Sequence, residues 1–110
     1  MDFIWLEFIK NHPLYSRPGK MDTFREIHAA DLGEVNETFR KNFHYLIEKK
    51  QMIPIEASRL FRFNEGFLIA FFNGYEPKGE TLERVAFMFE VSEEDLLHKE
   101  LFNEATNLLK

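Results

Sequence analysis

NGYEPKGETLERVAFMFEVSEEDLL, residues 73–97, is the stretch of this sequence that decides the fold. Asn73-Gly74 predicts a turn, and the chain then reaches Pro77. Beyond the proline, apolar residues fall on one face of a helix over about residues 80–89. These residues are Leu82, Val85, Ala86 and Phe89. The order of a turn followed by helices is more specific than any one of its parts.

Further helices are expected on both sides of residues 80–89. After them, Ser92 and Asp95 have the spacing of a capping box, which predicts a last helix over about residues 92–108. Before them, helical spacing of apolar residues and a first-turn proline predict three more helices. Their ranges are about 39–50, 54–61 and 64–72. Either Asp31 or Asn36 is placed to cap the first of these three.

Residues 34–97 as a whole resemble a lambda-repressor-like helix-turn-helix domain of the Xre (Cro-type) family. In that comparison the turn of the motif lies at residues 61–64, where Arg62 replaces the glycine that many members have. The resemblance implies an all-α fold, a five-helix domain over residues 34–110 that ends in a C-terminal helix. No segment has the pattern of a strand of useful length.

Residues 1–33 precede this domain and are expected to form an N-terminal helical extension. Residues 2–11 are apolar nearly all round, which predicts a helix that is buried on several sides. Prolines and a glycine predict a loop over about residues 12–20. Thr23 and Glu26 have capping-box spacing, so a short helix is expected over about residues 23–30.

Composition limits the function classes. The chain has 110 residues, of which 45% are hydrophobic and 13 are phenylalanine, enough for one folded domain with a large core. It has no cysteine, lacks the basic leader of a secretory signal and has no apolar stretch long enough to span a bilayer, so we expect a soluble cytoplasmic protein. The net charge is −5, and residues 34–97 carry eight Lys/Arg against twelve Asp/Glu. Duplex binding therefore requires the basic residues to cluster.

The resemblance implies which residues would contact duplex DNA. It places Glu65, Gly66 and Ala70 at base-contacting positions near the start of the third helix, and Pro54 at the second-helix position that often touches the backbone or a base. None of these side chains makes a bidentate contact to guanine or adenine. Phosphate contacts are expected from residues near the motif. These are Arg59, Arg62, Asn64 and Lys78.

The apolar residues of the third helix suggest a different kind of contact. Leu68 and Phe71 fall where the family packs its core. Phe67, Ile69 and Phe72 fall at positions that are usually polar or partly covered, so with Trp5 they would form a protein-binding patch if exposed. Alternatively, the N-terminal extension folds back over them and completes one larger core.

Two functions follow as hypotheses. The resemblance implies a DNA-binding transcriptional regulator, dimeric as most members are. The acidic charge and the poor base-reading residues favour a degenerate helix-turn-helix that acts as a protein-interaction module, for example an antirepressor or a regulator-binding protein. The histidines are dispersed along the chain and no catalytic or nucleotide-binding motif is present. We therefore expect no enzyme activity, cofactor, metal or small-molecule substrate.

Overall fold

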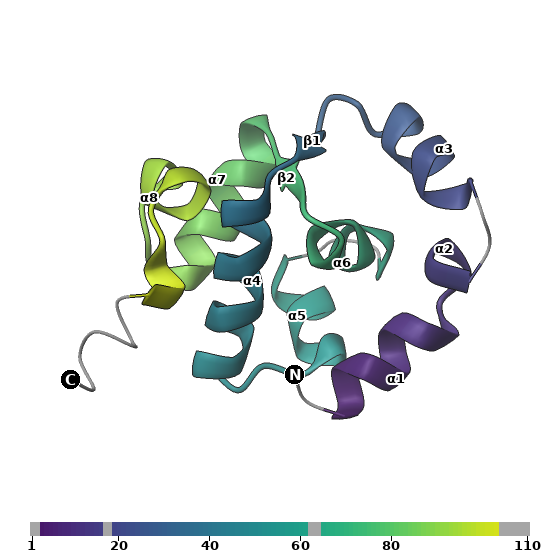
Figure 1. The fold of residues 1–110 in the computed structure, drawn as a ribbon, viewed down its shortest axis with the longest axis horizontal. Helices are drawn as coiled ribbons and strands as arrows, with labels where there is room; N and C mark the ends of the chain where they lie inside the picture. Colours follow the sequence, from purple (N-terminus) through teal and green to yellow (C-terminus); the bar gives the residue numbers. More distant parts are fainter. Residues whose placement is uncertain (1–2, 17–18, 62–64, 104–110) are drawn as a thin grey trace.

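The computed structural model describes residues 3–16, 19–61 and 65–103, which are mostly helical (Figure 1). In chain order the elements are α1 (Phe3–Asn11), α2 (Pro13–Ser16), α3 (Lys20–Ile27), β1 (Leu32–Val35), α4 (Glu37–Lys49), α5 (Pro54–Phe61), α6 (Glu65–Phe72), β2 (Tyr75–Pro77), α7 (Gly79–Phe89) and α8 (Glu93–His98). The all-α expectation is confirmed in part, because the described residues are mostly helical but also form a small two-stranded sheet. None of the helices in the described ranges is long and apolar enough to cross a membrane.

Helices α4 to α7 lie where the apolar spacing predicts them, within three residues at each end. Two of the predicted caps also form, at the start of α4 and at the start of α8. The side chain of Asn36 accepts a hydrogen bond from the Phe39 N–H (3.0 Å), and that of Ser92 accepts one from the Asp95 N–H (3.0 Å). Each cap satisfies an N–H group that has no partner within its helix.

Three other expectations about helices are wrong. The last helix does not run on from residue 92 to 108: α8 ends at His98, because Lys99 adopts an extended backbone (ψ 135°). Residues 104–108 lie outside the described residues. Part of the expected loop at 12–20 forms α2, and α3 begins at Lys20 rather than Thr23. The Thr23 hydroxyl donates to the Gly19 carbonyl (3.2 Å), so it does not cap a helix.

A two-stranded antiparallel sheet was not expected. β1 and β2 pair with Leu32 opposite Pro77 and Val35 opposite Tyr75, and the register is irregular between these pairs. Strands of four and three residues are too short to show alternation in a sequence. The sheet joins residues 32–35, which span the expected boundary between the N-terminal extension and the domain, to the segment that follows α6.

The turn before β2 forms as predicted. Gly74 has φ +97°, a left-handed conformation that an L side chain rarely adopts. A Cβ atom there would also lie 3.3 Å from side-chain carbons of Arg40 and Val35. Glycine therefore lets the chain leave α6 and turn directly beside α4.

The centre of the fold is α6, which packs against α2, α3, α4, α5 and β2. Figure 1 shows α1, α2 and α3 as an arc around one side of α6, while α7 and α8 lie on the far side of α4. The sequence of α6, EGFLIAFF, is apolar on all its faces. A helix of that composition is stable in water only when neighbours cover it on every side.

Candidate functional site

The motif helices α5 and α6 are adjacent, but α6 has almost no free surface. Seven of its eight residues, Gly66 to Phe72, are buried, and only Glu65 is exposed. Gly66 and Ala70, two of the three expected base-contacting residues, are therefore inaccessible, and Ala70 is 0% exposed. The expectation that both present themselves to a DNA groove is wrong, because α6 packs against α2, α3, α4, α5 and β2. Pro54 is buried as well.

The remaining DNA-contact candidates differ in their surroundings. Arg59 and Glu65 are exposed, near the end of α5 and at the start of α6. Lys78 is exposed just before α7, and its Nζ donates to the Ala29 carbonyl (3.3 Å). Arg62 and Asn64 lie outside the described residues.

The predicted apolar patch is core. Trp5, Phe67, Ile69 and Phe72 are 1%, 8%, 0% and 6% exposed, so the expectation of an exposed patch is wrong and the alternative of one larger core is confirmed. The Trp5 ring lies 4.7 Å from the Phe72 ring, and the Phe24 ring lies 5.4 Å from the Phe67 ring. Residues of α1 and α3 thus cover the two ends of α6. Leu68 and Phe71 are buried as expected.

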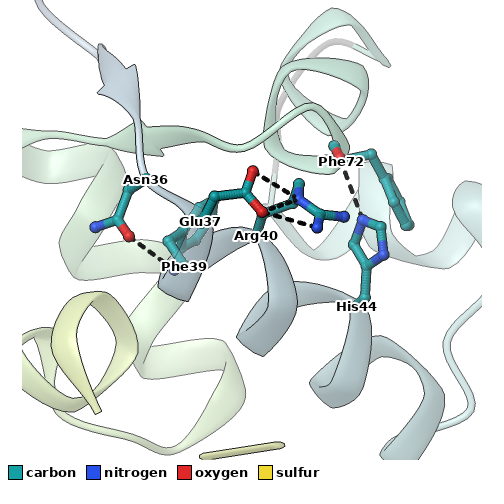
Figure 2. Close-up of polar contacts among 6 residues, drawn as sticks. All are labelled: Asn36, Glu37, Phe39, Arg40, His44 and Phe72. Atoms are coloured by element: carbon teal, nitrogen blue, oxygen red, sulfur yellow. Dashed lines mark hydrogen bonds and ion pairs between the residues drawn. The ribbon is translucent and has the colours of Figure 1, made fainter. Parts of the chain in front are cut away.

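Three histidines that are dispersed in the sequence lie next to α6, two near its start and one at its end. His12 Nε2 lies 3.9 Å from the Glu65 carboxylate at its start, and the His28 ring lies 4.9 Å from the Phe67 ring. His44 of α4 donates from Nε2 to the Phe72 carbonyl (3.2 Å) at its end (Figure 2). Sequence spacing gives no sign of this arrangement, because the three histidines come from distant parts of the chain.

We expect the position of His44 to make the free energy of unfolding depend on pH. Burial lowers its pKa, although the hydrogen bond to the Phe72 carbonyl acts in the opposite direction. The unfolded chain, with a histidine pKa of about 6.5, then binds the proton more readily than the folded chain. We expect the free energy of unfolding to decline as pH falls from about 6.5 towards the lower pKa of the folded state.

Urea unfolding at pH values between about 5 and 8 tests this expectation. His44→Gln is the matched variant, because glutamine does not titrate in this range and keeps an N–H donor. The stability of the native chain should fall more steeply below pH 6.5 than that of the variant. Parallel curves would show that His44 does not titrate differently in the two states.

Several basic side chains around the motif already have partners. Arg40 makes an ion pair with Glu37 (2.8 Å, Figure 2), and Lys50 lies 3.6 Å from a Glu90 carboxylate oxygen. The hydrogen bond from Arg40 lowers the Glu37 pKa. Exposed pairs of this kind add little stability, but a phosphate must compete with a carboxylate for each cation.

A groove opens beside the buried motif, between one face of α1 and the start of α5. It encloses about 550 Å³. Its apolar lining includes Ile4 and Phe8 from α1 together with Ile53 and Ile55, and its carboxylates are Glu7 and Glu65. We call it the α1–α5 groove. No Lys or Arg is among the described residues that line it.

Comparison with protein-family models, curated proteins and solved structures gave no match. The helix-turn-helix resemblance therefore stays a prediction. Within residues 3–16, 19–61 and 65–103, no three His, Asp or Glu side chains gather into a metal site. Two surfaces of the described residues lie next to the motif helices, namely the exposed charges of Arg59 and Glu65 and the α1–α5 groove.

Proposed function

We propose that this chain is a protein-interaction module, built on a helix-turn-helix-like arrangement of helices, that does not read DNA bases. The observation that carries the proposal is the burial of α6 from Gly66 to Phe72. A recognition helix reads sequence through side chains at base edges, and here those positions face the protein's own core. In this proposal α6 stabilises the core and does not bind DNA.

Opening the fold to expose α6 would be costly. Trp5, Phe67, Ile69 and Phe72 would lose most of their cover, and each large apolar side chain moved into water costs about 1.5–3 kcal/mol. Four such side chains approach the whole stability of a small domain, which is about 5–15 kcal/mol. Few phosphate contacts could compensate, since residues 34–97 carry more acidic than basic side chains.

Duplex binding distinguishes the proposal from a DNA regulator. We expect no salt-sensitive binding of the purified chain to random-sequence or genomic duplexes at about 50 or about 200 mM salt. The double variant Arg59→Ala, Lys78→Ala should behave like the native chain in this assay, because no phosphate contact is lost. Mass in solution, measured alongside, tests the expected homodimer.

The opposite result would overturn the proposal. It consists of micromolar or tighter binding to selected duplexes that weakens with salt and weakens again in the double variant. Such binding would require α1 to α3 to leave α6, or a mode of reading that does not use α6.

A further inference from the structure

Helix α1 has exposed apolar side chains on two of its sides, although its sequence predicts burial on several sides. Trp5 and Ile9 are buried, whereas Ile4 is 49% and Leu6 is 39% exposed. Ile55, at the start of α5, is 56% exposed. Ile4 and Ile55 both line the α1–α5 groove, so two elements from distant parts of the chain contribute exposed apolar side chains to the same depression.

We propose that the α1–α5 groove binds a short basic amphipathic helix of a partner protein. This inference rests on the proposed function and names the site and the chemical class of the partner. An apolar groove between helices accepts the apolar face of an added helix, with anchor residues spaced three to four apart. Along α1, Ile4, Glu7, Phe8 and Asn11 line the groove with that same spacing, so the α1 side of the groove has helical periodicity.

The negative charge of the groove lining favours a basic partner. Glu7 and Glu65 are the carboxylates of the lining, and the Glu65 side chain is 62% exposed. His12 also lines the groove, with its Nε2 3.9 Å from the Glu65 carboxylate, and the first turn of α5 faces the same region. A helix N-terminus carries only about half a positive charge, which is less than the negative charge of two carboxylates. Lys or Arg beside the apolar anchors would therefore gain affinity, whereas phosphate or an acidic helix would be repelled.

The length of the groove limits the size of the occupant. α1 has nine residues and so extends about 13–14 Å. A partner helix lying along it needs about three turns, or roughly 11 residues. A short segment of this kind fits a peptide-in-groove contact rather than a large domain interface.

Titration of the full chain with a defined peptide tests the groove. The probe is a leucine–lysine amphipathic helical peptide of about three turns, and the leucine–glutamate peptide of the same pattern is its control. Isoleucine methyl NMR reports the location, because Ile4, Ile53 and Ile55 line the groove while Ile27 is 71% exposed outside it. We expect the lysine peptide to shift the groove methyl signals and leave Ile27 in place.

Charge-reversal variants separate a specific site from attraction to an acidic protein. Glu7→Lys with Glu65→Lys should weaken binding by about tenfold. Glu34→Lys with Glu83→Lys makes the same change in net charge at exposed carboxylates outside the groove, and should leave the affinity nearly unchanged. Unfolded variants are recognised by their methyl spectra before titration.

Three results of the peptide titrations, and one result obtained without peptide, would overturn the groove proposal. The first three come from the titrations. They are the absence of shifts at Ile4 and Ile55, equal shifts with the glutamate peptide, and equal weakening by both double variants. Concentration-dependent shifts without peptide would show that a second copy of this chain, not a basic partner, occupies the groove. None of these results bears on duplex binding, so the groove proposal and the proposed function can fail separately.

Discussion

Replacing Asn42 with alanine should lower the free energy of unfolding by about 3 kcal/mol. Asn42 is 0% exposed on α4, and its amide nitrogen donates to the carbonyls of Leu96 (2.9 Å) and Lys99 (2.7 Å). Its side-chain oxygen accepts from the Leu101 N–H (2.9 Å). Alanine would remove these three hydrogen bonds at and just after the end of α8, although the Leu101 N–H also donates to the Lys99 carbonyl (2.8 Å). A buried polar group that is left unpaired costs about 1–3 kcal/mol. Water entering the vacated space would recover part of that cost.

Urea unfolding followed by circular dichroism measures the change, and Asn73→Ala is the matched control. Asn73 is exposed, and its side chain makes a hydrogen bond to the Ile69 carbonyl (3.0 Å), so its loss should cost less than about 1 kcal/mol. Asn42→Asp should be at least as damaging as alanine, because a carboxylate cannot donate to the two carbonyls. Equal costs for Asn42→Ala and Asn73→Ala would show that Asn42 does not hold α8 to α4.

The helices from α4 to α7 could be predicted because their signals are local. Apolar spacing, caps and the proline at the start of α5 depend on residues within one or two turns of each other. Asn42 could also have been found, since its position places it on the same face as Phe39 and Phe43, both buried. A polar residue on an apolar helix face needs a partner, although the sequence does not say which one.

The sequence did not decide whether α6 is exposed or buried, because its burial depends on contacts between distant segments. The composition of α6 indicates that something covers it, but it does not identify α1 to α3 as the cover. The resemblance places Gly66 and Ala70 at base-contacting positions, whereas both residues are buried in the structure. The same long-range packing places His12, His28 and His44 around α6.

The α1–α5 groove was missed for a related reason. The apolar composition of residues 2–11 predicts a helix that is buried on several sides. In the structure, neighbouring elements cover only part of α1, and Ile4 and Leu6 are exposed. That the exposed Ile4 shares a groove with Ile55 follows only from the packing of α1 against α5. The candidate interaction surface is therefore a consequence of tertiary packing, and no motif marks it.

Trp5→Ala should have the largest effect of any single substitution considered, a loss of about 3–5 kcal/mol in the free energy of unfolding. Trp5 is 1% exposed, it packs on Phe72 at 4.7 Å between ring centroids, and its indole N–H donates to the Met52 carbonyl. Alanine removes the ring contact and the hydrogen bond, and leaves a cavity at the end of α6. Urea unfolding followed by circular dichroism should show one cooperative transition at a lower midpoint, because α1 belongs to the core that contains α6.

Two further substitutions in α1 serve as controls for Trp5→Ala. Trp5→Phe keeps an aromatic ring near Phe72 but loses the N–H donor, so it should cost less than Trp5→Ala. Leu6→Ala, at a residue that is 39% exposed, should cost about 1 kcal/mol or less. If Trp5→Ala instead leaves the midpoint unchanged while amide exchange rises only in residues 3–27, then α1 to α3 form a separable cover. In that case α6 becomes accessible, and salt-sensitive duplex binding by Trp5→Ala alone would identify the N-terminal helices as a block on DNA contact.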